Sequence, residues 1–207
     1  MFETLQKITL VKNAKTPVNK WSDKANHHTN LPNMSKHNVG ILTGAINNII
    51  VVDVDVKDDG LKTWDAYIAS SGMVLDTVKV KTPSGGYHYY FKYATKDKKN
   101  NYLIETYLIN KTKYRGVGID IRSNGGYVVG PPSNINGVGY ELVNDACSMM
   151  EMPQALIYWL MAVYEPDKQA TIQHGFKNVV AKAVVTKAVV AKPVDEQPME
   201  HIPTKCL

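Results

Sequence analysis

The chain has 207 residues, 44% of them hydrophobic and 21% charged, which is the composition of a globular protein with one ordinary domain and an appendage. The net charge of +5 is compatible with a polyanionic partner without requiring one. The only two cysteines, Cys147 and Cys206, are far apart, which argues against a zinc site or a disulfide framework and favours an intracellular, cytoplasmic location. No apolar run approaches the ~20 residues of a membrane span and no signal peptide begins the chain, so we expect no membrane partner.

The first segment, residues 5–11, fits either a strand or a short helical turn. A polar loop runs from about residue 15 to residue 33 and contains Trp21, which in such a loop most often packs against the core. Residues 38–44 then predict a short apolar strand, and residues 45–48 a turn.

Residues 49–56, with six β-branched apolar residues among eight, predict a buried strand. Two acidic residues interrupt it, Asp53 and Asp55. Residues two apart in a strand point to the same face, with Cα atoms roughly 6.5 Å apart. Adjacent buried carboxylates are costly unless a cation lies between them, so the pair indicates a divalent metal site. The alternative is the fraying end of a strand, since turn residues follow at 57–60.

The next segments predict a helix and a hairpin. Apolar residues at helical spacing over residues 61–70 predict a helix with Trp64 in the core, ending at Gly72. Residues 77–81 alternate as a strand does. The sequence Thr82-Pro83-Ser84-Gly85-Gly86 predicts a turn, and residues 87–93 the returning strand.

Residues 94–115 are rich in lysine and asparagine, and predict either a solvated loop or an edge that contacts phosphates. Residues 116–122 predict a strand, 123–126 a tight turn, and 127–130 the strand that pairs with 116–122. A last small strand is predicted at 140–142.

The period of the apolar pattern changes after Pro153, where a helical face predicts a helix that stops before Pro166. We therefore predict one domain over residues 1–166. Residues 167–207 contain a five-residue repeat that fits neither helix nor strand, and predict a flexible tail, either a tether to a partner or a dispensable extension.

Strand alternation places several polar residues on common faces. His88 faces with Tyr90, and Asp120 faces with Arg122. If the strands are neighbours in one sheet, three carboxylates, a histidine and an arginine converge on one surface. Three carboxylates with one or two Mg²⁺ or Mn²⁺ ions make a phosphoryl-transfer site. Backbone N–H groups of Ser84, Gly85 and Gly86 can cradle phosphates, with His88 and Arg122 neutralising a triphosphate.

These segments resemble the primase-polymerase (prim-pol) domain of the archaeo-eukaryotic primase superfamily, found in plasmid, phage and viral replication proteins. The resemblance spans about residues 8–165 and rests on these motifs in order: Lys15-Thr16-Pro17 with Trp21, Asn38-Val39-Gly40, Asp53-Val54-Asp55, Thr82 to His88, Gly118 to Arg122, Gly125 to Val129, Pro131-Pro132-Ser133, and Met152-Pro153 with Tyr158-Trp159-Leu160.

The resemblance implies an α+β fold with an RRM-like antiparallel or mixed sheet and packed helices. It implies Asp53, Asp55 and Asp120 as ligands of two Mg²⁺ or Mn²⁺ ions, and His88 with the turn 84–86 as contacts to an incoming NTP or dNTP. The implied reaction is template-dependent attack of a 3′-hydroxyl on an α-phosphate, on single-stranded DNA. The first helix usual in the family is nearly absent, and no zinc-binding insertion is visible. No Gly-x-x-x-x-Gly-Lys-Ser/Thr motif occurs, so a separate replicative helicase is an expected partner unless the chain acts alone or is a fragment.

Three other hypotheses remain beside the template-dependent primase/polymerase. The first is a catalytically silent nucleic-acid-binding accessory module of the same fold, which the presence of all three carboxylates and the histidine disfavours. The second is a replication-initiator nuclease, whose His-hydrophobic-His pair is not matched by the adjacent His27 and His28. The third is a structural role, with the aspartates in turns.

Overall fold

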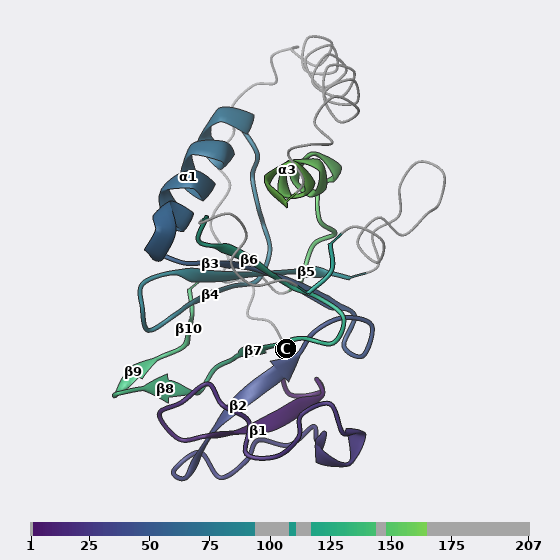
Figure 1. Ribbon diagram of the computed structural model, residues 1–207, viewed down its shortest axis with the longest axis vertical. Coiled ribbons are helices and arrows are strands. Elements are labelled where there is room, and N and C mark those ends of the chain that lie inside the picture. The colour runs from purple at the N-terminus through teal and green to yellow at the C-terminus, as the bar shows by residue number, and fades with distance from the viewer. Residues whose placement is uncertain (1, 94–107, 111–116, 144–147, 165–207) are drawn as a thin grey trace, which may run out of the picture. The chain divides into compact units, whose positions relative to one another are not determined.

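The computed structural model describes residues 2–93, 108–110, 117–143 and 148–164. These residues belong to one compact unit, Met1–Tyr164. Within them the chain forms three antiparallel sheets and two α-helices (Figure 1). The predicted tail, 167–207, and most of the lysine-rich segment 94–115 lie outside the described residues.

The central sheet has five strands in the order β10-β4-β5-β3-β6, and every pairing in it is antiparallel. Its strands are β3 (Ile49–Val54), β4 (Lys79–Lys81), β5 (Tyr87–Lys92), β6 (Ile119–Arg122) and β10 (Glu141–Leu142). Without β10, the first strand along the chain lies between the third and the fourth, as in an RRM-like split βαβ sheet. The predicted α+β class is confirmed.

Two helices cover one face of this sheet, α1 (Gly60–Ser71) and α3 (Gln154–Tyr164) (Figure 1). A short 3-10 helix, Lys57–Asp59, leads into α1. Both predicted helices are confirmed. Trp64 is 1% exposed in the core beneath α1, as its helical spacing predicts. Gly72 ends α1 with a φ of 61°, a left-handed conformation that glycine adopts without strain. None of the described helices is long and apolar enough to cross a membrane.

A three-stranded sheet covers the opposite face, in the order β1-β2-β7, with strands β1 (Lys7–Val11), β2 (His37–Leu42) and β7 (Tyr127–Val129). Residues 5–11 therefore contain a strand rather than a helical turn. A further hairpin, β8 (Asn134–Ile135) with β9 (Val138–Gly139), turns at Asn136-Gly137. That hairpin is missing from the sequence-based prediction, although Asn-Gly is a strong hairpin signal.

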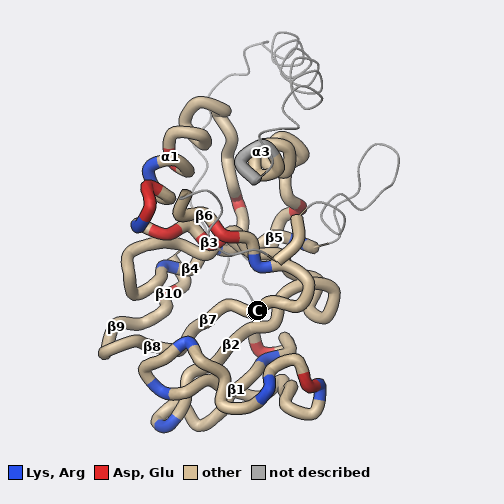
Figure 2. Tube along the Cα trace, in the orientation of Figure 1, with Lys and Arg blue, Asp and Glu red and all other residues tan. Residues whose placement is uncertain are grey.

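Charge is distributed unevenly over the described chain. Figure 2 shows lysines gathered around β1 and β2, and acidic residues near the start of α1 and the adjacent sheet. Lys24 lies in a second 3-10 helix, Lys24–Asn26, within the β1–β2 connection.

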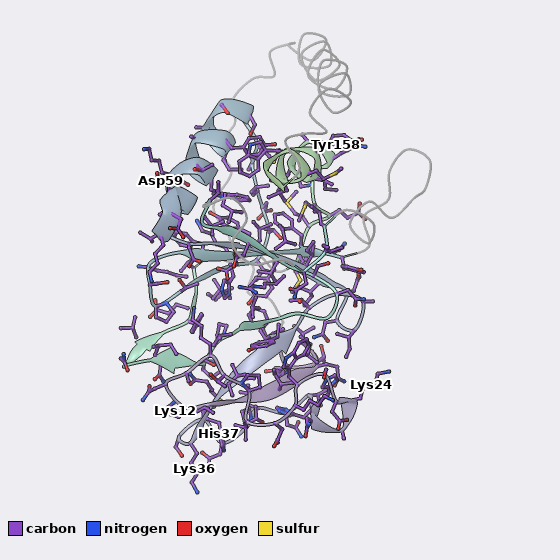
Figure 3. The ribbon with its side chains drawn as sticks, in the orientation of Figure 1. Lys12, Lys24, Lys36, His37, Asp59 and Tyr158 are labelled. Carbon is purple, nitrogen blue, oxygen red and sulfur yellow. The ribbon has the colours of Figure 1, made fainter. Side chains whose placement is uncertain are left out.

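A hydrophobic core lies on each side of the central sheet, and the side chains of β3 point alternately into one and the other. Ile50, Val52 and Val54 face the helices, whereas Ile49 and Val51 face the three-stranded sheet. Side chains fill the space on both sides of the central sheet (Figure 3). Since Asp53 has the parity of Ile49 and Val51, it faces the three-stranded sheet.

Two predictions about strands are wrong. The strand predicted over residues 49–56 ends at Val54, so Asp55 lies one residue beyond it. Residues 127–129 pair with β2 instead of with the strand before them. Residues 127–129 pair with β2 because the chain turns a corner at residues 123–126. Thr43, just after β2, donates its backbone N–H to Gly126 O (3.0 Å) and its hydroxyl to Ser123 O (2.7 Å), which directs β7 to the other sheet.

Candidate active site

The centre of the site is a row of three polar residues across adjacent strands. Asp53 on β3 is directly opposite His88 on β5 and directly opposite Asp120 on β6. Residues opposite each other in antiparallel strands have Cα atoms about 4.5–5.5 Å apart and side chains on the same face. The convergence predicted from strand alternation is therefore observed for these three residues.

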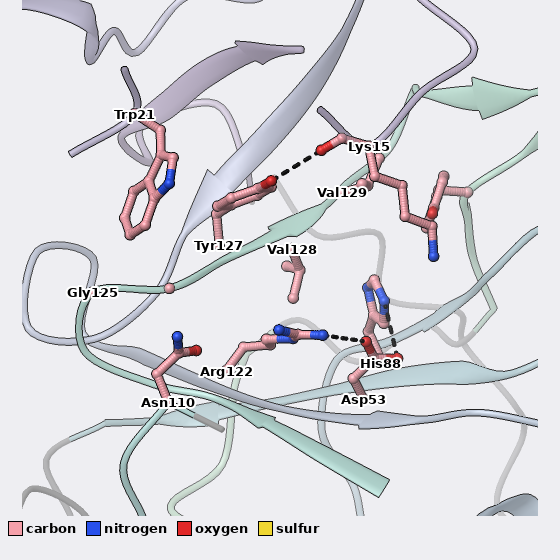
Figure 4. Close-up of a pocket in the computed structure, with 12 residues that line it drawn as sticks. Lys15, Trp21, Asp53, His88, Asn110, Arg122, Gly125, Tyr127, Val128 and Val129 are labelled. Carbon is pink, nitrogen blue, oxygen red and sulfur yellow. Dashed lines mark hydrogen bonds and ion pairs between the residues drawn. The ribbon is translucent and has the colours of Figure 1, made fainter. Parts of the chain in front are cut away.

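Basic side chains lie against these carboxylates. The Nε2 atom of His88 is 3.4 Å from Asp53 Oδ1, and a guanidinium nitrogen of Arg122 is 3.8 Å from Asp53 Oδ2. The same Arg122 nitrogen donates to Asp120 Oδ2 at 2.9 Å. Figure 4 shows Asp53 between His88 and Arg122. Arg122 thus bridges two carboxylates that would otherwise repel each other.

Asp53 on β3 and Asp55, just after the end of β3, have pKa shifts in opposite directions. Burial alone would raise the pKa of Asp53, but His88, Arg122 and Lys15 together bring it below its ordinary value. Burial raises the pKa of Asp55, and the charges of Asp53 and Asp120 raise it further. Asp53 is therefore held as a carboxylate, whereas burial and the neighbouring aspartates disfavour the negative charge of Asp55.

Glycines hold the backbone around Asp55. Its N–H donates to Gly118 O at 2.7 Å, and its carbonyl accepts from Leu61 N at 2.8 Å. A Cβ at Gly60 would lie 2.0 Å from Gly118 O, and one at Gly118 would lie 1.9 Å from Lys57 O. Only glycine allows these backbones to approach so closely, and this packing fixes Asp55 beside β6.

The predicted phosphate turn lies at the same end of β3. Gly85 has a φ of 89° and donates its N–H to Thr82 O at 3.0 Å. A Cβ at Gly86 would lie 2.3 Å from Val54 O and 3.3 Å from the Cα of Asp55. Ser84 is exposed, and its hydroxyl lies 3.0 Å from that of Thr82. The turn therefore borders Asp55, but its residues do not line the cavity over Asp53.

That cavity has a volume of about 200 Å³ and lies between the two sheets. Its floor includes Asp53, His88 and Arg122. The other lining residues are Lys15, Trp21, Asn110, Gly125, Gly126, Tyr127, Val128, Val129 and Tyr140. Acidic, basic and aromatic side chains thus share one concave surface, which suits an anionic ligand that carries a ring.

Residues 6–155 match the Prim-Pol family, described as bifunctional DNA primase/polymerase, N-terminal. This match covers more than half of the chain and includes all of the predicted site residues. The chain belongs to the Prim-Pol family. No match is found among the curated proteins.

Membership in the Prim-Pol family supports the general activity of a primase/polymerase nucleotidyltransferase, with DNA and nucleotides as substrates. The assignment of individual residues to this activity stays a prediction, but the structure does bring the predicted residues near one another. Asp53, His88, Asp120 and Arg122 are brought together by sheet register, and Asp55 by the glycine packing at the strand end.

Some residues that line the cavity were not predicted as site residues. Lys15, Trp21 and Tyr127 line the cavity, and the hydroxyl of Tyr127 donates to the carbonyl of Lys15 at 3.0 Å. Trp21 does pack against the core beneath the three-stranded sheet, as expected, yet it also faces the cavity. The sequence signal for Lys15 and Trp21 was the motif that contains them. This motif lies far from Asp53 along the chain, so the sequence alone does not show that they share a cavity.

Metal ligation stays a prediction. Over the described ranges, no group of three or more His, Cys, Asp or Glu residues is arranged to hold a metal ion. The oxygens of Asp53 and Asp120 are engaged by Arg122 and His88 instead. The donor set nevertheless fits a hard divalent cation, because all three aspartates offer carboxylate oxygens. A cation would also offset the burial and the neighbouring negative charges that raise the pKa of Asp55.

Proposed function

We propose that this Prim-Pol domain is a template-dependent nucleotidyltransferase, a DNA primase/polymerase that joins nucleoside triphosphates on single-stranded DNA. We place it in the replication of a mobile element or virus. The observation that carries the proposal is the row His88–Asp53–Asp120. Two of its residues, Asp53 and His88, line a cavity between two sheets together with Arg122. Three acidic residues and their basic neighbours at one point suit phosphoryl transfer better than a structural role, since buried charges are costly.

Asp53, Asp55 and Asp120 would hold one or two Mg²⁺ or Mn²⁺ ions. Such ions lower the pKa of an attacking 3′-hydroxyl and stabilise the charge that develops on the phosphate. Asp53 suits this role because its pKa is held low and it stays ionised. Asp55 suits it because its disfavoured charge gains most from a bound cation.

Three basic side chains would receive the triphosphate. His88, Arg122 and Lys15 all line the cavity, and all three act electrostatically on Asp53. The turn at Ser84, Gly85 and Gly86 offers backbone N–H groups at the neighbouring end of β3. Arg122 and His88 would exchange their carboxylate contacts for phosphate oxygens when a nucleotide binds. Binding of the nucleotide would thereby free the aspartates as ligands.

One observation favours a second candidate. The 2.9 Å ion pair between Arg122 and Asp120 occupies an oxygen of a proposed metal ligand. A catalytically silent nucleic-acid-binding accessory module would keep that ion pair permanently. The two candidates differ in whether the protein incorporates nucleotides. For the active enzyme we also expect a separate replicative helicase as partner and an intracellular location.

A nucleotide-incorporation assay tests the proposal. Full-length protein is incubated with single-stranded DNA, labelled NTPs or dNTPs, and Mg²⁺ or Mn²⁺. The expected result is metal-dependent product from the wild type and at least 100-fold less from Asp53→Asn and from Asp120→Asn. Asp65→Asn, at an exposed position of α1, is the matched control and should retain activity. Binding of DNA without any product would favour the accessory module.

A further inference from the structure

Among the residues that the structure describes, positive charge is concentrated at the beginning of the chain. The described residues up to 42 contain six lysines and two acidic residues, a net +4, whereas the described residues after 42 have a net charge of −3. The lysine-rich segment 94–115, most of which lies outside the described residues, also has a net charge of +4. The overall charge is too small to indicate a nucleic-acid partner, but its localisation changes that conclusion. A polyanion would meet the positive potential of one lobe, formed by β1, β2 and their connection (Figure 2).

Four lysines of this lobe are exposed: Lys15, Lys20, Lys24 and Lys36. Lys12 is half-buried and donates to Met34 O at 2.7 Å. Figure 3 shows Lys12, Lys24 and Lys36 around the outside of the lobe. One of the two acidic residues, Asp23, accepts from Ala25 N at 3.0 Å, as the N-cap of the short helix Lys24–Asn26. Most of the exposed positive charge is thus available to an incoming anion.

An aromatic residue connects this lobe to the cavity. Trp21 is half-buried, and its ring centroid lies 5.6 Å from that of Tyr127, at an interplanar angle of 59°. His27 holds the backbone carbonyl of Trp21 through Nε2 at 2.8 Å, and Tyr127 holds the carbonyl of Lys15. Trp21 is therefore fixed at the cavity, with lysines before and after it in the same connection (Figure 4).

We propose that the connection between β1 and β2 is the surface that binds single-stranded DNA and leads it to the cavity. Lys20, Lys24 and Lys36 contact phosphates of the strand, and Trp21 stacks on a base. Lysines for the backbone with an aromatic ring for the bases form the pattern of sequence-tolerant single-strand binding. The choice of DNA as the polyanion rests on the proposed function, whereas the location of the surface rests on the charge and on Trp21.

The first experiment measures binding of a labelled oligothymidylate by fluorescence anisotropy over a range of salt concentrations, with full-length protein and without nucleotide or divalent metal. For Lys20→Glu/Lys24→Glu/Lys36→Glu, the expected affinity is at least tenfold lower, and the slope of log K against log salt falls by about 2, as expected for three lost phosphate contacts. The matched control is Lys62→Glu/Lys81→Glu/Lys92→Glu, with the same charge change at exposed sites on α1, β4 and β5. Equal losses in both variants would overturn the proposal.

The second experiment tests stacking. Trp21→Ala should weaken binding about tenfold, whereas Trp21→Phe should keep most of the affinity, because a smaller ring still stacks. Binding of DNA to the wild type should quench tryptophan fluorescence, and the quenching should be lost in Trp21→Phe. Trp64, which is buried, and Trp159 would remain as unquenched emitters. Unchanged affinity in Trp21→Ala would contradict the assignment.

Failure of this inference is distinguishable from failure of the proposed function. Asp53→Asn/Asp120→Asn should bind single-stranded DNA as the wild type does, since its lobe is intact. A wild type that binds with the predicted salt slope but incorporates nothing would refute the polymerase and leave this surface standing. Incorporation that continues normally in the triple lysine variant, with normal binding, would refute the surface alone.

Discussion

At the residue scale, Asp53 determines the electrostatics of the site. Of the three aspartates, only Asp53 lies opposite a predicted site residue on both neighbouring strands, His88 on β5 and Asp120 on β6. His88 and Arg122 offset the cost of its burial, whereas nothing comparable offsets that of Asp55. Two carboxylates two residues apart thus have pKa shifts in opposite directions, and each shift leads to a separate measurement.

The lowered pKa of Asp53 predicts a pH-dependent contribution to stability. Because its folded-state pKa lies below the unfolded value of about 3.9, the ionised carboxylate stabilises the fold at higher pH. That contribution is lost as the pH falls through the folded-state pKa. The free energy of unfolding of the wild type should exceed that of Asp53→Asn by on the order of 1 kcal/mol at pH 7.

Urea unfolding of both proteins from pH 7 down to pH 3 measures this difference. We expect it to be constant above about pH 4.5 and to shrink below about pH 4. A difference that does not change with pH would contradict the assigned pKa direction.

The raised pKa of Asp55 predicts the opposite effect. Asp55→Asn removes a charge that burial and the other aspartates disfavour, so the metal-free variant should melt roughly 2–4 °C higher than the wild type, for a gain of about 1 kcal/mol. Excess Mn²⁺ should raise the Tm of the wild type and raise that of Asp55→Asn much less.

Thermal melts with and without Mn²⁺ check this prediction, and the exposed Asp65→Asn serves as control. A Tm below that of the wild type in the metal-free variant would show that the charge of Asp55 is stabilised in the fold. An equal Mn²⁺ shift in both proteins would remove Asp55 from the metal site.

At the scale of elements, the end of β3 depends on backbone packing as much as on side chains. The segment after Val54 bends at once into a 3-10 helix, with Asp58 and Asp59 both at positive φ, near 50°. Gly60 and Gly118 allow this bend to lie against the start of β6. The position of Asp55 relative to Asp53 and Asp120 follows from that packing.

A methyl group at Gly118 should disrupt this arrangement. Its Cβ would lie 1.9 Å from the carbonyl oxygen of Lys57, which is backbone and cannot rotate away. We expect Gly118→Ala to lower the free energy of unfolding by about 3 kcal/mol or more. Gly139→Ala, whose Cβ would meet only ordinary contacts at 3.7 Å, should change it by less than about 1 kcal/mol. Urea unfolding of both variants measures the contrast, and equal stability would refute the packing argument.

Much of the sheet was predictable because a strand has a side-chain period of two. Alternation gave the facing of Asp53, His88 and Asp120 within each strand, and their convergence was predicted on the condition that the three strands are neighbours; the apolar spacing of residues 61–70 located α1. The partner of residues 127–129 was not predictable in this way. A tight turn at residues 123–126 suggests a hairpin, and only the bonds from Thr43 to that turn direct β7 to another sheet.

The residues that line the cavity could not be predicted from local sequence patterns either. Lys15, Trp21 and Tyr127 share a cavity with Asp53 only because two sheets stack, and no periodicity within a segment indicates which sheets stack. The family motifs pointed to the same residues by resemblance, without saying what they contact.

At the scale of the whole described unit, the central sheet separates two tasks. One face packs against α1 and α3 in a core that includes Trp64, Leu156 and Leu160. The other face carries the acidic site and the lysine-bearing lobe. Substitutions in the helical core should therefore change stability without changing the chemistry of the site.

Leu160→Ala tests this separation. Leu160 is fully buried in α3, so its truncation should cost about 2–5 kcal/mol of unfolding free energy. Its neighbour Met161 is half-buried, and Met161→Ala should cost less. Binding of oligothymidylate below the Tm should be normal in both variants. A selective loss of DNA binding in folded Leu160→Ala would show that the two faces are coupled.

The most direct measurement of the central claim is nucleotide selection by the template. The wild type is given homopolymeric single-stranded templates with Mn²⁺ and each labelled nucleotide in turn, beside Asp53→Asn and the exposed control Asp65→Asn. The account predicts incorporation of the complementary nucleotide alone by the wild type and by Asp65→Asn, and none by Asp53→Asn. Incorporation by Asp53→Asn at the wild-type rate, or no incorporation by the wild type under any of these conditions, would contradict it.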